Sequence, residues 1–280
     1  MTIRHAPYED SADFAIGLKP IAEADWLEGG EADPFARKDP LFSAHRQTVF
    51  GELPGSEAGQ EEVLALVEAA RGPTAREGWP ALYAAARAVA DDLVLMEKRA
   101  GAWTVTAISL SAPSFFSVPE VLGRPLDQIH APVHGFSDRF LSRVVRIFEG
   151  LRPGLVLQRR NWTIANSAEP FMPDAVAMRA RIDAIEPASA GEELFVRVER
   201  QTLRRLPRTG GALFTIRVWL HPLGALAREP ERLAAFARAW KSAPPDFRAY
   251  KRLAAYDRLI EAFLEAHKCG AQASSSGVRR

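Results

Sequence analysis

The sequence has a single cysteine, Cys269, among its 280 residues. One thiol cannot form a disulfide within the chain, and it cannot build a zinc or iron–sulfur site from several cysteines of this chain. No stretch approaches the roughly 18 uncharged apolar residues that a membrane-spanning helix needs, and the N-terminus has no apolar core of signal-peptide length. We therefore expect a cytoplasmic globular protein that does not enter a membrane.

An excess of charge of one sign is also missing. Lys and Arg total 36 and Asp and Glu total 35, which gives a formal net charge of +1. A dedicated nucleic-acid binder normally carries a large basic excess, so we expect no nucleic-acid partner. The sequence contains no GxGxxG, Walker, HExxH or GxSxG motif. The motifs that usually indicate a nucleotide-dependent enzyme or a zinc peptidase are therefore missing.

The sequence predicts that the N-terminal third is an irregular segment followed by helices. Residues 1–55 have scattered Pro and Gly and no sustained periodicity, so we expect an arm that wraps the core with short helical turns at most. Ser56 is a suitable N-cap for a helix over 57–71, and a second, Ala-rich helix is predicted over 79–91. These two helices should pack together.

Five β-rich runs follow in the rest of the chain. They cover residues 92–98, 102–113, 155–165, 193–206 and 212–220. Alternation of side chains is clearest in the last run, and turn residues at 98–101 and 209–211 predict antiparallel hairpins. The sequence therefore predicts an antiparallel sheet.

Helices are predicted between the second and third strands and at the C-terminus. A capping box on Ser117 predicts that a helix begins over 118–127. The other predicted helices cover 138–151, 229–241 and 246–267. This order is that of a PAS domain, so the expected fold is α+β, with a PAS-like five-stranded antiparallel sheet and flanking N- and C-terminal helices. We treat it as one structural unit with four parts: an arm with helices, the PAS-like core, C-terminal helices and a disordered tail, at 1–91, 92–225, 226–268 and 269–280.

Two histidines, His130 and His134, stand four residues apart in the segment IHAPVHGF. On a regular helix this spacing would form a metal-binding pair, but Pro132 and Gly135 disfavour a regular helix, and no nearby carboxylate completes a metal site. A single neutral imidazole is enough to hold a haem iron. The alternative is a histidine that orders its loop by hydrogen bonding.

The segment FVRVERQTLRRLPR concentrates arginine. Alternation in a strand places Arg197, Glu199 and Gln201 on one face and Arg200 on the other, so charges occupy both faces. Arg217 adds a cation to the apolar partner strand. These charges could form a solvated, ion-paired hairpin, or the arginines could bind carboxylates or phosphates of an anionic ligand while Glu199 serves a cation or a proton.

Asn161 and Trp162 interrupt the third predicted strand with side chains on opposite faces. A tryptophan at such a position usually belongs to the core. An asparagine is less usual in a β-run, and we expect Asn161 to line a polar ligand pocket.

The chain resembles the alpha subunit of bacterial haem-dependent oxidative N-demethylase from about residue 16 to about residue 225. The resemblance is carried, in order, by GLKPIAEADWLE, FGELPGSEAGQEEVL, DDLVLMEK, VPEVLGRPLDQIHAPVHGF, the LRPG and NWTI pair, VERQTLRRLPRTGGALFTIR and HPL. The hairpin VERQTLRRLPRTGGALFTIR is the most specific of these segments, and IHAPV is next.

This resemblance implies a PAS-like fold with flanking helices that binds haem b. It implies oxidation of a methyl group of dimethylamine, which gives methylamine and formaldehyde from amine and O2. Electrons would come from NADPH through a separate reductase subunit that contains flavin and an iron–sulfur cluster, and another subunit would pass formaldehyde to tetrahydrofolate. The alternative is a haem-binding PAS sensor or an electron-transfer module that turns over no substrate.

The resemblance also implies roles for individual residues. His130 matches the motif histidine and would be the proximal iron ligand, while Glu199 matches the acidic residue of VERQTL and would hold a protonated amine. The candidates for pairing with the haem propionates are four arginines, which cannot all share one face: Arg200, Arg204, Arg205 and Arg217. His134 departs from the family pattern, and it could be a second haem-pocket histidine that competes for the iron.

Overall fold

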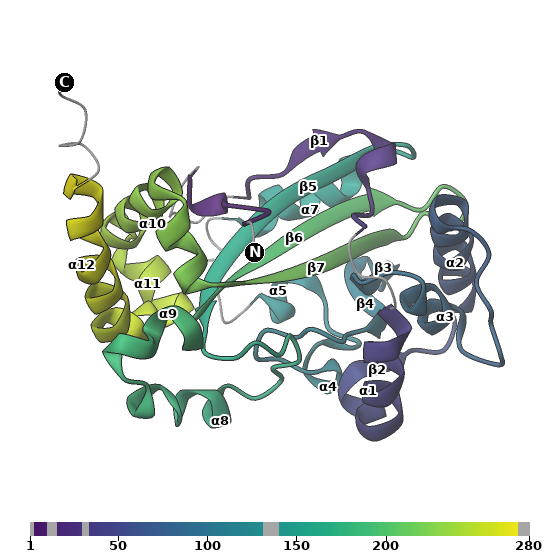
Figure 1. Ribbon diagram of the computed structural model, residues 1–280. Coiled ribbons are helices and arrows are strands. Elements are labelled where there is room, and N and C mark those ends of the chain that lie inside the picture. The colour runs from purple at the N-terminus through teal and green to yellow at the C-terminus, as the bar shows by residue number, and fades with distance from the viewer. Residues whose placement is uncertain (1–2, 10–15, 30–33, 131–139, 274–280) are drawn as a thin grey trace.

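A seven-stranded antiparallel sheet runs through the molecule (Figure 1). The computed structural model describes residues 3–9, 16–29, 34–130 and 140–273. The strands are β1 (Lys19–Ile21), β2 (Phe50–Glu52), β3 (Asp92–Arg99), β4 (Ala102–Ser109), β5 (Val156–Ala165), β6 (Phe195–Arg205) and β7 (Ala212–Pro222). Their order across the sheet is β1-β5-β6-β7-β3-β4-β2, which makes β6 and β7 interior strands.

All five predicted strands are present as β3 to β7, but the predicted five-stranded PAS sheet is wrong. The segment expected to be an irregular arm adds one strand to each edge: Lys19 pairs with Gln158 of β5, and Phe50 pairs with Ser109 of β4. Each added strand has only three residues and contains Pro20 or Gly51, residues that are depleted in strands. Such short strands show no alternation that sequence analysis could detect.

The two hairpins close at the predicted turns. Ala100 and Gly101, between β3 and β4, both have positive φ, at 48° and 83°. Gly210, between β6 and β7, has a φ of 74°, a conformation that glycine adopts without steric cost. The resulting register places Glu199 opposite Val218 and fixes which side chains share a face of the sheet.

The helices form three groups around the sheet. At the N-terminal side are α1 (Pro34–Val49), α2 (Glu57–Arg71) and α3 (Ala81–Arg87); between β4 and β6 are α4 (Val118–Val121), α5 (Leu126–Ile129), α7 (Leu141–Gly150), α8 (Ala175–Arg179) and α9 (Ala190–Glu193); at the C-terminal side are α10 (Pro230–Ser242), α11 (Pro245–Lys251) and α12 (Asp257–Ala273). Figure 1 shows α1–α3 gathered at one end of the sheet and α10–α12 at the other. Within the described residues, no helix is both long and apolar enough to cross a membrane.

The helix predictions differ from the structure in several places. The prediction over 57–71 is confirmed by α2, whereas α3 is shorter than predicted and α1 was not expected. The predicted helix over 246–267 is broken at Arg252, whose φ of 53° is left-handed, so the chain forms α11, a short 3-10 turn and α12. The helix α12 continues to Ala273, past the start of the expected tail.

Candidate functional site

The alternation of β6 gives the sheet two chemically different faces. We call one the Glu199 face; it carries Arg197, Glu199 and Gln201 from β6 together with Arg159 and Asn161 from β5, which stand opposite Gln201 and Glu199. We call the other the Arg200 face. It carries Arg200 and Arg204 from β6 and Arg217 from β7, which stands opposite Arg200. The predicted alternation of the arginines and Glu199 agrees with this register.

Glu199 is held at both carboxylate oxygens. The hydroxyl of Ser114 donates to Glu199 Oε1 over 2.5 Å, and the side-chain amide of Gln201 donates to Oε2 over 3.0 Å. Arg197 lies 3.7 Å from Oε1 and also donates to the Ser114 hydroxyl over 2.8 Å. The carboxylate is therefore oriented by three neighbours, of which one is charged.

Arg197 is held in place by hydrogen bonds to two loop segments that lie over the sheet. It is fully buried, and its guanidinium donates to the carbonyl oxygens of Ala112 at 2.6 Å and Pro170 at 3.2 Å. Burial by itself lowers the pKa of Arg197, whereas the charges of Glu199 and Asp92 raise it. Arg197 is thus a structural cation that is paired inside the protein with Glu199.

The charges near Glu199 keep it ionised. Burial raises the pKa of this carboxyl. The opposing effect of its neighbours is larger, so that its pKa lies below the usual range; these neighbours are Arg197, Lys251, Ser114 and Arg159. Lys251, the last residue of α11, shows the opposite balance. Burial lowers its pKa to about 8, although Glu199 acts to raise it.

His130 ends α5 on the same side of the sheet. Its Nδ1 lies 2.9 Å from the carbonyl oxygen of Leu126, and because a carbonyl only accepts, Nδ1 carries the proton. Burial lowers the pKa of His130, and the positive charge of Arg159 lowers it further. The imidazole is therefore neutral at pH 7, with its lone pair on Nε2, which is the form that binds iron.

The structure places three of the predicted site residues, His130, Asn161 and Glu199, on the same side of the sheet. Asn161 stands opposite Glu199 in the sheet, and Arg159 lies near enough to both His130 and Glu199 for its charge to act on each of their pKa values. His134 lies outside the described residues.

Two arginines of the Arg200 face, Arg200 and Arg204, are committed to the N-terminal arm. Arg200 is buried and donates to the carbonyl oxygens of Asp25 and Trp26 at 2.5 and 2.7 Å. Arg204 pairs with Glu23 at 2.5 Å, and its guanidinium lies 4.2 Å from the centroid of the Trp26 ring. These two residues are separated from Glu199 by the sheet itself.

Arg217 has a charged neighbour on the Arg200 face. Its guanidinium lies 4.4 Å from the centroid of the Trp219 ring, and its charge is the largest of those that lower the pKa of Asp91. Burial nevertheless raises the pKa of Asp91 to about 6. The charge of Arg217 is therefore balanced in part by a carboxyl inside the protein.

Arg205 falls on the Glu199 face by alternation, but at the far end of β6. Six residues of extended strand separate it from Glu199, which corresponds to roughly 20 Å. Its guanidinium lies 5.2 Å from the centroid of the Trp103 ring. The structure does not bring Arg205 to Glu199.

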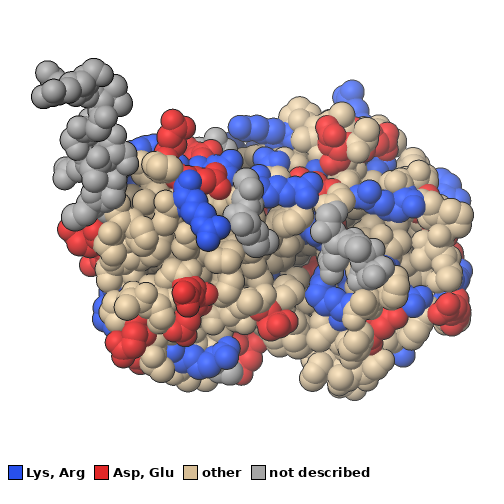
Figure 2. Space-filling model, viewed as in Figure 1, with Lys and Arg blue, Asp and Glu red and all other residues tan. Residues whose placement is uncertain are grey.

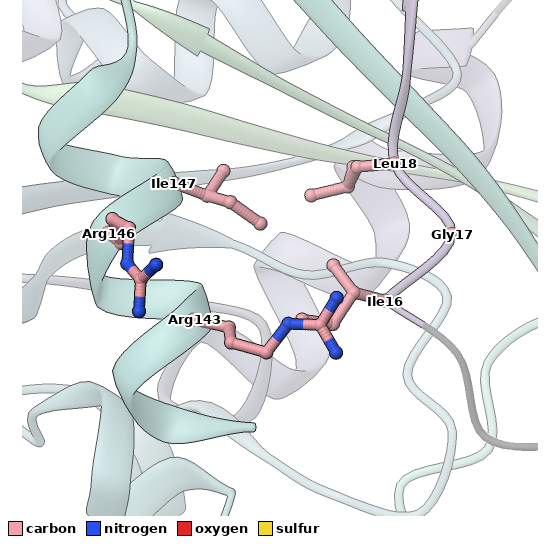
Figure 3. A pocket seen from close by; sticks show the side chains of 6 residues that line it. All are labelled: Ile16, Gly17, Leu18, Arg143, Arg146 and Ile147. Atoms are coloured by element: carbon pink, nitrogen blue, oxygen red, sulfur yellow. The ribbon is translucent and has the colours of Figure 1, made fainter. Parts of the chain in front are cut away.

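A separate groove of about 390 Å³ lies between α7 and the start of β1 (Figure 3). Leu18 and Ile147 point toward one another there, and Arg143 extends from α7 toward Ile16. Among the described residues, none of the predicted site residues lines this groove. Figure 2 shows basic and acidic side chains interspersed over the face of the molecule in view.

Sequence reasoning missed several residues of the Glu199 face. Arg159 could have been found, because it occupies the strand position two residues before Asn161 and therefore shares its face. Ser114 and Lys251 could not, because they lie 85 and 52 positions from Glu199 along the chain, in a loop and a helix end that no local pattern links to β6. Only the folded chain brings them together.

The chemistry of His130 fits the iron of a haem group. In the described parts of the chain, no three His, Cys, Asp or Glu side chains come together as a metal site, but haem iron needs only one protein ligand on its proximal side. The hydrogen bond from Nδ1 of His130 to a backbone carbonyl is the arrangement that orients an iron-binding imidazole. The site can therefore supply an imidazole ligand, with an ionised carboxylate on the same face of the sheet.

One comparison with known proteins identifies the family. A family model described as haem-dependent oxidative N-demethylase, alpha subunit-like, matches residues 68–260. The match covers more than half of the chain, from the end of α2 into α12, and it includes His130, Asn161 and Glu199.

Proposed function

The chain belongs to the haem-dependent oxidative N-demethylase alpha-subunit-like family, and from this premise we propose that it is the haem b-binding subunit of an enzyme that removes a methyl group from a small alkylated amine such as dimethylamine. The description as an alpha subunit implies other subunits. We propose that one is a reductase with flavin and an iron–sulfur cluster that supplies electrons from NADPH, and that another passes formaldehyde to tetrahydrofolate.

The observation that carries this proposal is the ionised carboxylate of Glu199 on the face that His130 approaches. A protonated dialkylamine has two N–H donors, and a carboxylate fixed by Ser114 and Gln201 can accept one of them in a charge-assisted hydrogen bond. Asn161, opposite Glu199 in the sheet, offers a side-chain carbonyl for the second donor. These two residues would orient the N-methyl group.

Haem, when bound through His130, would supply the oxygen-activating chemistry that oxidises the methyl carbon. The overall reaction balances when one O2, two electrons and two protons convert an N-methylamine to the demethylated amine, formaldehyde and water. The protein contributes the imidazole ligand and the positioning of the amine. It also keeps Glu199 ionised, because Arg197 and Lys251 lower the pKa of this carboxyl.

The proposal is tested by haem binding and by product formation. We expect the purified chain to show a Soret band after haemin is added, and to release formaldehyde from dimethylamine aerobically with a surrogate reductant. The band should be lost in His130→Ala and kept in His134→Ala. Haem binding without amine-dependent formaldehyde or any spectral response to amines would favour the sensor or electron-transfer module instead.

Glu199→Gln tests the assignment of the amine site. Because the variant keeps the shape of the side chain and removes its charge, we expect the affinity for dimethylamine, followed by its effect on the haem spectrum, to fall about tenfold or more. Haem loading should stay the same. Glu192→Gln, which changes an exposed side chain of α9, is the control and should match the unchanged protein.

A further inference from the structure

Two cations on the Glu199 face have no carboxylate within ion-pair distance among the described residues. Arg159 uses its Nε to donate to Gln201 over 2.6 Å, and its two terminal nitrogens make no hydrogen bond to any residue that the structure describes. Lys251 has the ring of Tyr250 5.3 Å from its ammonium nitrogen, and this nitrogen makes no hydrogen bond within the same described part of the chain. Both are at least partly buried, so they are not ordinary surface charges.

These cations converge from two elements. Arg159 projects from β5, whereas Lys251 comes from the end of α11, which is distant in sequence. The charges of both act on Glu199, and that of Arg159 also acts on His130. Burying two like charges beside each other is costly unless an anion accompanies them, and Glu199 is already paired with Arg197 at 3.7 Å.

We propose that Arg159 and Lys251 bind the two propionate carboxylates of haem, in place of the arginines of the Arg200 face. This inference rests on the proposed function, because it assumes that haem is the ligand. The two positive charges equal the two negative charges of the propionates. The terminal nitrogens of Arg159 can make paired hydrogen bonds to one carboxylate, and the Lys251 ammonium can serve the other as a point charge.

Arg200 and Arg204, on the Arg200 face, are poorly placed for this role. Arg200 donates to two carbonyl oxygens of the N-terminal arm and lies 3.1 Å from Glu28, and Arg204 is paired with Glu23. Both point away from the side of the sheet where Glu199 lies. Arg159, by contrast, lies on the Glu199 face, and its charge acts on the pKa of His130.

The experiment compares the binding of haemin with that of haemin dimethyl ester, which lacks the two negative charges. Each compound is titrated into the full chain freed of haem, and the Soret band is followed. We expect Arg159→Gln and Lys251→Gln each to weaken haemin binding about tenfold or more, and to change binding of the dimethyl ester less than twofold. Arg159→Lys, which keeps the charge, should lose less than Arg159→Gln.

The controls are matched to each variant. Arg160→Gln changes the next residue of β5, which is exposed and faces the opposite way, and Lys241→Gln changes an exposed lysine of α10. Neither should alter haemin binding. If Arg159→Gln does not fold, Lys251→Gln carries the test alone, because the ammonium group of that lysine makes no hydrogen bond within the described chain.

Three outcomes would overturn the inference. Equal weakening for haemin and its dimethyl ester would show that the residues act on the pocket and not on the carboxylates. Unchanged haemin binding in both variants, or a loss in Arg204→Gln confined to haemin, would place the propionates elsewhere. In each of these cases the protein without substitutions still binds haem. Absence of a Soret band in that protein would instead contradict the proposed function itself.

Discussion

The pKa of Lys251 is set by burial and by the charged side chains around it. Burial lowers its pKa to about 8, Glu199 acts to raise it, and Arg159 and Arg197 act to lower it. Tyr250, beside it on α11, has a raised pKa and so stays neutral through this range. The ammonium group of Lys251 is therefore the group of this cluster whose charge changes between pH 7 and pH 9.

Haem binding should accordingly depend on pH. A propionate stabilises the charged form of Lys251, so haemin affinity is greatest below pH 8 and falls as the pH rises through that value, by about tenfold between pH 7 and pH 9. Haemin titrations at the two pH values measure this. Lys251→Arg stays charged in this range and should remove most of the dependence; an equal decline in that variant would contradict the prediction.

At the scale of residues, the sequence predicts the face of a side chain well and its partners poorly. Because the side-chain period of a strand is two, the placement of Glu199 with Gln201, and apart from Arg200, follows from alternation alone. The contact of Ser114 with Glu199 depends on where a loop crosses β6. The commitment of Arg200 to Trp26 depends on an arm that has no periodicity of its own.

The helix α2 secures the β6–β7 hairpin at the scale of elements. Glu62 is buried and accepts hydrogen bonds from the backbone N–H groups of Arg208 and Thr209, at 2.6 and 2.8 Å, and from the Thr209 hydroxyl at 2.7 Å. Burial raises the pKa of Glu62, but these hydrogen bonds lower it below its usual value. One carboxylate thus holds the turn between β6 and β7.

Glu62→Gln should destabilise the fold by about 2 kcal/mol, because hydrogen bonds to a charged acceptor are lost. The stabilisation is present above the unfolded pKa of the carboxyl and is lost as the pH falls through its lower folded value. Urea unfolding at neutral and acid pH measures both effects. Glu61→Gln, the exposed neighbour that pairs with Arg76, should cost less than 1 kcal/mol.

The elements predicted from the sequence are those with a strong local period. Strands β3 to β7 and helix α2 have one, and they are where the patterns placed them. The helix α1 contains Pro40 and a non-helical residue at His45, and both weaken the pattern that would have revealed it. The break at Arg252 has no proline or glycine to mark it, so it could not be anticipated.

At the scale of the whole molecule, the N-terminal arm is part of the core. Trp26 is 2% exposed, lies under Arg204, and belongs to a hydrophobic cluster with residues of α2, α3 and β3. The matched family region begins at residue 68, yet β1, β2 and α1 all precede it. The arm therefore completes a sheet whose other strands lie within the matched region.

Trp26→Ala should lower the free energy of unfolding by about 3–5 kcal/mol, because it opens a cavity beneath Arg204. Thermal or urea unfolding measures the loss. Phe35→Ala, a large side chain that is 46% exposed, is the control and should cost far less. In the folded variant the haem spectrum should be unchanged, because Trp26 lies on the Arg200 face; a spectral change would contradict the separation of the two faces.

The two-sided use of β6 restricts how this protein can change in length. Inserting or deleting one residue within β6 would turn Glu199 toward the arm and Arg200 toward His130. The ion pair of Glu199 with Arg197 and the hydrogen bonds of Arg200 to the arm would then be lost together. Substitution can alter either face alone, but a shift in register cannot. We therefore expect the lengths of related chains to vary in the loops around the sheet and to stay constant between Phe195 and Arg205.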